Sequence, residues 1–171
     1  AAQAIRQRNR TAAITMLTEE EALPYYRPAL SDFLSEDLPD KRLYVFDAAW
    51  YQENAIEVKT GFKVNSIDTA AKIVSGDNGE NLTYNKLIVA SGARSNIPPF
   101  PGVEKEGVFA LRNLKDAIKL KEAIKTSKKA VVIGGGVLGL EAVWEMVSAG
   151  LEVSVVEFGE RLMPRQLDDS S

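Results

Sequence analysis

The chain has 171 residues, 45% of them hydrophobic and 26% charged, which is typical of a globular protein with one domain or two small ones. Its net charge of −3 gives no general attraction to nucleic acid or anionic membranes. The absence of Cys and His excludes disulfides, thiolate nucleophiles, imidazole catalysis and the commonest zinc ligands, and we expect no metal site. The sequence shows no membrane span or signal-peptide pattern, so we expect a cytoplasmic protein with no membrane partner.

The chain opens with a predicted helix, a strand and a group of acids. Residues 1–10 are alanine-rich and then cationic, as in the second half of a helix, and the apolar segment 12–17 predicts a strand. Glutamates at 19–21 follow. This order repeats the second half of the unit described below for residues 129–157, but its first strand and glycine loop are missing. We therefore expect a fragment.

The next segments have mixed patterns. Two prolines bracket Arg27 in LPYYRPALS, which predicts a stiff loop with a fixed guanidinium, although a plain surface turn is the alternative. Short helical segments are expected at 31–36 and 48–54. From residue 56 the pattern has period two and predicts an antiparallel meander of strands at 56–58, 62–64, 72–74 and 81–84. A buried strand of the parallel type, 86–90, follows it.

The second half contains a proline-rich boundary at 98–101 and a basic amphipathic helix at 113–129. That helix could dock an acidic protein, but charged helix faces are more often simply solvated. A buried strand at 130–133, a glycine turn, a helix and a second strand at 151–155 then form one unit that ends at Glu157.

The glycine turn has the G-x-G-x-x-G spacing. Gly134 allows a tight turn, Gly136 lets the backbone approach a pyrophosphate, and Gly139 lets the helix pack closely on the sheet. Glu157 lies 18 residues (157 − 139) beyond the last glycine, where an acid accepts hydrogen bonds from ribose hydroxyls and repels a 2′-phosphate. This arrangement favours NAD over NADP; the alternative is a glycine-rich turn that binds nothing.

Three motifs in this order resemble those of the FAD-dependent pyridine nucleotide oxidoreductases, in the branch of rubredoxin reductase, the nitrite reductase large subunit and apoptosis-inducing factor. The first motif is the strand at 14–17 with Glu19 and LPYYRPALS. The second, LIVASGA at 87–93, resembles the family's A-T-G motif, with Ser91 in place of threonine. The third, VIGGGVLGLE at 132–141, is similar to the family's NADH loop.

The resemblance implies roles for individual residues. FAD would be bound by Glu19 at its ribose, Arg27 at its pyrophosphate, Val64 at its adenine, and the turn Ala90, Ser91 and Gly92 near its pyrophosphate and ribityl chain. NADH would be bound by Gly134, Gly136, Val137, Leu138 and Gly139 at its pyrophosphate, Glu157 at its ribose and Glu141 near its nicotinamide. No residue is assigned an acid–base catalytic role. The Lys that often follows R-P-x-L-S is Asp32 here, which leaves that contact to the flavin open. The first FAD glycine loop is absent, so we expect FAD to be held weakly or not at all.

The expected fold class is α/β, with Rossmann-like doubly wound parallel sheets and an inserted antiparallel meander, truncated at both ends. Residues 1–102 would form part of an FAD-binding domain and residues 103–171 part of an NAD-binding domain. Without Cys, the resemblance implies an enzyme that passes electrons from NADH through FAD to a small carrier such as rubredoxin. Alternatives are a peroxide-forming NADH oxidase, a nitrite reductase subunit, or a nucleotide-binding or interaction module without turnover. Uncovered apolar sheet faces would favour a homo-oligomer.

Overall fold

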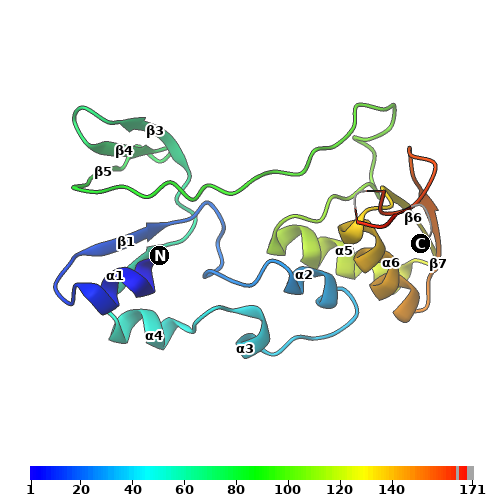
Figure 1. Cartoon of the computed structure of the whole chain (residues 1–171), viewed down its shortest axis with the longest axis horizontal. Coiled ribbons are helices and arrows are strands. Elements are labelled where there is room, and N and C mark those ends of the chain that lie inside the picture. The colour runs from blue at the N-terminus through cyan, green and yellow to red at the C-terminus, as the bar shows by residue number, and fades with distance from the viewer. Residues whose placement is uncertain (165, 169–171) are drawn as a thin grey trace. The chain divides into compact units, whose positions relative to one another are not determined.

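The computed structural model describes residues 1–164 and 166–168, and the chain forms two compact units (Figure 1). Unit 1 contains residues 1–25 and 40–93, and unit 2 contains residues 26–39 and 94–171. The segment 26–39 therefore belongs with the second half of the chain. The predicted α/β class, with parallel strands and an inserted antiparallel meander, is confirmed.

Unit 1 combines a parallel pair of strands with a small antiparallel sheet. Ile56 pairs with Ile14 at the start of the parallel pair, and Leu17 pairs with Lys59 at its end. The antiparallel sheet has the order β3-β4-β5. The elements of unit 1 are α1 (Ala2–Arg8), β1 (Ile14–Leu17), α3 (Asp40–Leu43), α4 (Ala48–Glu53), β2 (Ile56–Lys59), β3 (Val64–Asp68), β4 (Ile73–Gly76) and β5 (Asn81–Thr83).

Two predictions about the meander were wrong. The strand at 56 belongs to the parallel pair, because alternation along the sequence predicts a strand but not its partner. The strand expected at 62–64 instead begins at Val64. The Phe62 N–H donates to the carbonyl of Thr18 at 2.8 Å, so this residue joins the loop after β1, and its ring is buried.

The buried strand predicted at 86–90 was also wrong. Residues 87–93 have no regular secondary structure in the structure. Ile88 is 60% exposed and Val89 is 68% exposed. Among the described residues no strand lies beside this segment to complete a ladder, and an unpaired extended segment cannot bury both faces.

Unit 2 contains one strand–helix–strand unit together with two further helices. Its elements are α2 (Ala29–Asp32), α5 (Leu114–Thr126), β6 (Lys129–Ile133), α6 (Val137–Ser148) and β7 (Glu152–Val156). A capping box starts α5: the Asn113 side chain accepts from the Asp116 N–H at 2.8 Å, and the Asp116 carboxylate accepts from the Asn113 N–H at 3.2 Å. None of the described helices is both long and apolar enough to span a membrane.

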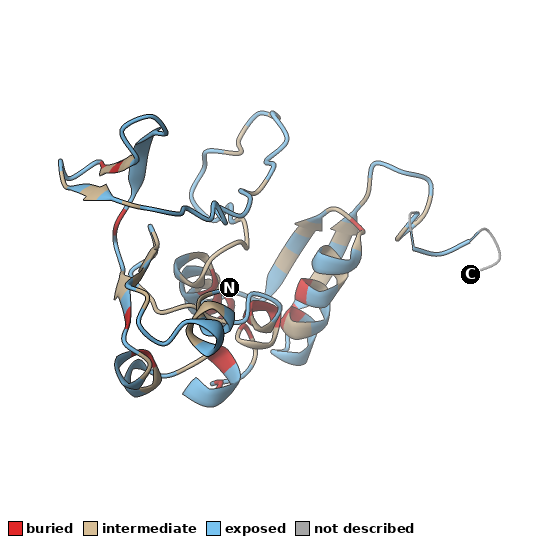
Figure 2. Ribbon diagram, turned by 60° about the vertical axis from the view of Figure 1, so that its left-hand side comes forward, coloured by how far each residue is buried: buried red, intermediate tan, exposed pale blue. Residues whose placement is uncertain are grey.

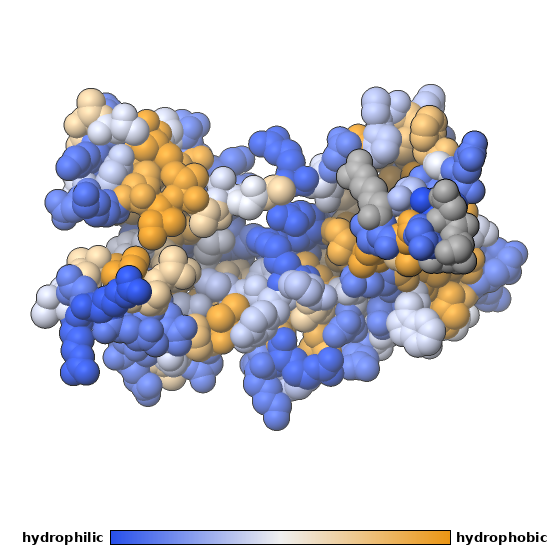
Figure 3. Space-filling model, in the orientation of Figure 1, coloured by the Kyte–Doolittle hydropathy of each residue, from blue (hydrophilic) through white to orange (hydrophobic). Residues whose placement is uncertain are grey.

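Helix α6, in which Ala142 and Met146 are buried, covers only one face of the β6–β7 pair (Figure 2). The strands alternate between partly covered and exposed residues, and Val131 and Ile133 on the open face are 65% and 57% exposed. The prediction that β6 is buried on both faces was therefore wrong. Apolar side chains are visible at the surface of each unit in Figure 3.

In unit 1, Arg6 joins the end of α1 to the turn before β2. Its Nε donates to the carbonyl of Asn54 at 2.7 Å and its Nη2 to the carbonyl of Ala55 at 2.8 Å. Its Nη1 donates to the carbonyl of Arg10 at 2.9 Å. Ala55 has a left-handed backbone with φ of 47°, so this guanidinium holds a turn that an alanine rarely adopts.

We predict that Arg6→Lys lowers the free energy of unfolding by about 1–3 kcal/mol, because a single ammonium cannot reach all three carbonyls. Urea unfolding followed by far-UV circular dichroism measures the change. Arg8→Lys, on the same helix at an exposed position, is the matched control. Equal urea midpoints for the two variants would contradict this role for Arg6.

Candidate dinucleotide-binding site

The glycine turn between β6 and α6 combines two geometric requirements. Gly134 has φ of +111°, which L side chains rarely adopt, and its N–H donates to the Val156 carbonyl at 2.8 Å, one step beyond the ladder. A Cβ on Gly139 would lie 2.0 Å from the Gly134 carbonyl oxygen. The first turn of α6 therefore lies directly on the loop, and both positions require glycine.

The space above the turn is open at Gly136. A Cβ built there meets no atom within 4 Å. The first intrahelical bond runs from the Leu140 N–H to the Gly136 carbonyl at 3.0 Å, so the N–H groups of residues 137–139 precede the helical ladder. Together with the helix dipole of this 12-residue helix, they form an arrangement suited to an anion.

Glu157 lies beside this turn with both carboxylate oxygens bound. Its Oε2 accepts from the Gly135 N–H at 2.6 Å, and its Oε1 accepts from the Gly159 N–H at 2.8 Å. These backbone donors, first Gly159 and then Gly135, lower the pKa of Glu157 below its usual 4.5. The side chain is thus a fixed anion at the end of β7.

A return segment, residues 158–163, folds back over the turn. The Met163 N–H donates to the Gly135 carbonyl at 2.9 Å, and Met163 itself is left-handed with φ of 47°. The Leu162 side chain lies against Gly135. Gly135 was not predicted as a site residue, because the G-x-G-x-x-G pattern leaves the residue between its first two glycines unspecified. Leu162 lies outside the pattern and carries no sequence signal.

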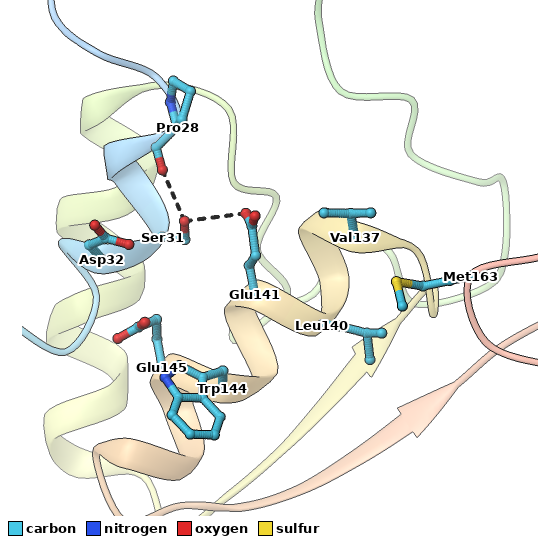
Figure 4. A pocket seen from close by; sticks show the side chains of 9 residues that line it. All are labelled: Pro28, Ser31, Asp32, Val137, Leu140, Glu141, Trp144, Glu145 and Met163. Atoms are coloured by element: carbon cyan, nitrogen blue, oxygen red, sulfur yellow. Dashed lines mark hydrogen bonds between the residues drawn. The ribbon is translucent and has the colours of Figure 1, made fainter. Parts of the chain in front are cut away.

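A groove of about 410 Å³ lies between α2 and α6, with Met163 at one end (Figure 4). Glu141, the residue expected near the nicotinamide, lies in its wall. The Ser31 hydroxyl lies 3.0 Å from the Pro28 carbonyl oxygen and 3.4 Å from a Glu141 carboxylate oxygen. The lining residues are Pro28, Ser31, Asp32, Val137, Leu140, Glu141, Trp144, Glu145 and Met163.

The groove is acidic on one side and apolar on the other. Asp32 and Glu145 lie with Glu141 near α2, and the Ser35 hydroxyl donates to Glu145. Val137, Leu140 and Met163 face the other side. Asp32 adds a third carboxylate to Glu141 and Glu145, at the position where the sequence resemblance leads one to expect Lys. Across residues 1–164 and 166–168, no group of three or more acidic side chains has a geometry suited to a metal ion.

Lys121 fixes the segment after α2 against α5. Its ammonium donates to the Glu36 carbonyl at 2.5 Å and to the Asp37 carboxylate at 2.9 Å, and it lies 4.5 Å from the centre of the Phe33 ring. The hydrogen bond and charge of Lys121 lower the pKa of Asp37. Lys121 belongs to the basic helix expected at 113–129, whose charged face was predicted to be solvated, but Lys121 itself is only 9% exposed.

The candidate FAD residues of unit 1 are only partly brought together. The loop after β1 is hydrogen-bonded to the turn before β3. The Glu19 carboxylate lies 3.8 Å from the ammonium of Lys63, which precedes Val64 in the sequence. Ala90, Ser91 and Gly92 lie in the extended segment, where Gly92 has φ of +68°. The loop that contains Glu19 is therefore joined to the turn that leads into Val64.

Arg27, the candidate pyrophosphate ligand of FAD, belongs to unit 2. One of its terminal nitrogens donates to the Arg112 carbonyl at 2.8 Å, which ties the segment before α2 to the segment before α5. The expected fixed guanidinium is therefore present, and its visible role is to join two segments of unit 2.

The chain is similar to known proteins along its whole length. Residues 1–171 match the family described as pyridine nucleotide-disulphide oxidoreductase. The chain is 41% identical over 155 residues to the nitrite reductase [NAD(P)H] of Bacillus subtilis, covering 91% of this chain and 19% of that protein. It is 36% identical over 155 residues to the NADH-rubredoxin oxidoreductase of Clostridium acetobutylicum, covering 91% of this chain and 40% of that protein.

Solved structures agree with these sequence matches. A ferredoxin reductase from Rhodopseudomonas palustris superposes with a TM-score of 0.91 at 31% identity, over 99% of this chain and 42% of that one. The chain thus spans between about a fifth and two fifths of the length of these relatives. With the family matched over every residue and the glycine turn, helix and acid in their places, the chain belongs to the pyridine nucleotide-disulphide oxidoreductase family.

Proposed function

We propose that the chain is part of an FAD-dependent NADH oxidoreductase and that unit 2 binds the NADH. The observation that carries this proposal is the site formed by the open position at Gly136, the free first turn of α6 and the fixed carboxylate of Glu157. An open backbone, a positive helix end and an anion are what a pyrophosphate and a ribose require. Glu157 would accept from the ribose hydroxyls and repel a 2′-phosphate, which favours NADH over NADPH.

The groove beside Glu141 extends the same site. A nicotinamide whose pyrophosphate lies at the start of α6 can reach along the helix toward Leu140 and Glu141, which line the groove. The apolar wall of the groove suits the nicotinamide ring and would exclude water from that ring. We place the nicotinamide here.

In unit 1, Glu19 and the neighbouring backbone of Val64 would hold the adenosine end of FAD, and the segment Ala90–Gly92 would lie along its pyrophosphate. The ion pair between the Glu19 carboxylate and the ammonium of Lys63, the residue before β3, supports this placement. Bound FAD would supply the redox chemistry, as an acceptor of hydride from NADH and a donor of single electrons.

The electron acceptor is proposed to be a small redox protein of the rubredoxin or ferredoxin kind. The support is the naming of several relatives as rubredoxin or ferredoxin reductases. The relative from Bacillus subtilis, named as a nitrite reductase, favours a second candidate, in which the chain is part of a nitrite reductase subunit.

Calorimetric titration of the chain with ADP-ribose, which contains the pyrophosphate and the adenosine ribose, tests the NADH site directly. We expect saturable binding at one site, and no heat of binding would contradict the proposal. The FAD site is tested by mixing with FAD, desalting and recording the visible spectrum, then adding NADH without oxygen. A retained flavin that bleaches faster than free FAD supports both sites; a flavin bleached no faster than free FAD contradicts the proposal for the chain.

We predict different effects for two alanine substitutions in the glycine turn. Gly136→Ala adds a methyl group to open space, so the fold is kept while affinity for ADP-ribose falls by about tenfold or more, because the methyl occupies the approach of the pyrophosphate. Gly139→Ala places a methyl against the Gly134 carbonyl and is expected to lower the free energy of unfolding by about 3 kcal/mol. Calorimetry and urea unfolding measure the two effects. Unchanged affinity for ADP-ribose in a folded Gly136→Ala variant would show that the turn is not a pyrophosphate site.

We also propose that the chain associates with copies of itself. The support is the open apolar face of β6 and β7, with Val131, Ile133 and Val156 exposed. Light scattering should give a mass above the 18.7 kDa of one chain at micromolar concentration. Ile133→Lys should reduce that mass, and a monomer for the unchanged chain would refute the proposal.

A further inference from the structure

We propose that Gly135 is a positioning residue for Glu157, the ribose-binding acid. The hydrogen bond from the Gly135 N–H to Glu157 would set the preference for an unphosphorylated adenosine ribose. The inference rests on the proposed function of unit 2 as a dinucleotide site. It concerns a residue that the G-x-G-x-x-G pattern leaves open, and it is carried by the contacts of the Glu157 carboxylate.

The first step is the count of acceptor positions on Glu157. A carboxylate offers about four lone-pair positions, two on each oxygen. The Gly135 N–H occupies one on Oε2 at 2.6 Å, and the Gly159 N–H occupies one on Oε1 at 2.8 Å. The Phe158 N–H also interacts with this carboxylate. At least one lone-pair position is then left open, and it can accept from a hydroxyl of an adenosine ribose.

The second step is orientation. A glutamate side chain has three rotatable bonds, and ordering it on binding would oppose affinity. Two backbone donors, one on each oxygen, fix the plane of the carboxylate before the ligand arrives. A phosphate on the 2′-oxygen would lie next to this fixed anion. The backbone hydrogen bonds to Glu157 would therefore strengthen both its attraction for ribose hydroxyls and its repulsion of a 2′-phosphate.

The third step is that a side chain at residue 135 would press on Glu157. Gly135 is absent from the glycines with positive φ, so its backbone suits any L residue. A Cβ there would lie 2.5 Å from Leu162 Cδ2, 3.2 Å from Glu157 Oε2 and 3.3 Å from Glu157 Cβ. Leu162 is half exposed and its methyl can move aside, whereas the Glu157 carboxylate can move only by lengthening its bond to the Gly135 N–H.

Gly135→Ala is therefore expected to fold and to displace Glu157. Calorimetry with ADP-ribose and with its 2′-phosphorylated form gives the ratio of their affinities. In the unchanged chain we expect ADP-ribose to bind more tightly. In Gly135→Ala we expect its affinity to fall by about tenfold while the 2′-phosphorylated ligand is weakened less or not at all, so that the ratio falls.

Gly136→Ala is the matched control. The pyrophosphate is common to both ligands, so a substitution that blocks its approach should weaken the binding of both equally. Glu157→Gln places an amide NH₂ against one of the backbone donors, so it should lower the ratio as Gly135→Ala does. Combining the two changes should add little, since both remove the same interaction.

Two outcomes would overturn the inference: an unchanged ratio of the two affinities in Gly135→Ala, or fully additive effects of Gly135→Ala and Glu157→Gln. Equal weakening would mean that Gly135 serves only the turn. Failure of the unchanged chain to bind ADP-ribose would instead refute the proposed function, so the two failures are distinguishable. Urea unfolding of Gly135→Ala confirms that binding is measured on folded protein.

Discussion

The site in unit 2 depends on the close approach of α6 to the end of β6. Because residue 139 has no side chain, the helix begins directly over the Gly134 carbonyl, where a methyl group would lie 2.0 Å from the oxygen. The parallel register then determines the position of the acid. Ile133 pairs with Val156, and the Gly134 N–H bond to Val156 extends the ladder, so the next residue, Glu157, necessarily lies beside the turn. One contact and one register thus bring an open helix end and a fixed anion together.

This part of the site could be predicted from the sequence because its causes are local. Glycine spacing, a short run of β-branched residues and a helical period all act within about thirty residues, and each has a direct geometric meaning. The helix expected after the glycine turn is α6, and the acid expected 18 residues (157 − 139) after Gly139 lies where the register requires it. The roles of these residues in binding remain predictions.

The errors arose where the partner of a segment decides its structure. The segment 86–90 has the composition of a buried strand, but a strand forms only beside another strand, and no neighbour exists among the described residues. Ile56 alternates like a meander strand yet pairs in parallel with Ile14. The groove could not be predicted for the same reason. Ser31 and Glu141, which lie in its wall, are 110 residues apart in the sequence. The segment after α2 is held by the hydrogen bonds of Lys121 to residues 36 and 37. No local pattern contains these long-range contacts.

The glycines of the turn also show why a sequence pattern and a structure carry different information. Gly134 is required by its dihedral angle, and Gly139 is required by contact with backbone. Gly135 satisfies neither of these conditions, and a general fingerprint therefore leaves its position free. Its constraint comes from side chains, Leu162 on the return segment and Glu157 after β7, which meet only when both strands are paired. A residue that the motif does not specify is thereby joined to the acid that the motif does specify, and the position of the Glu157 carboxylate depends on both.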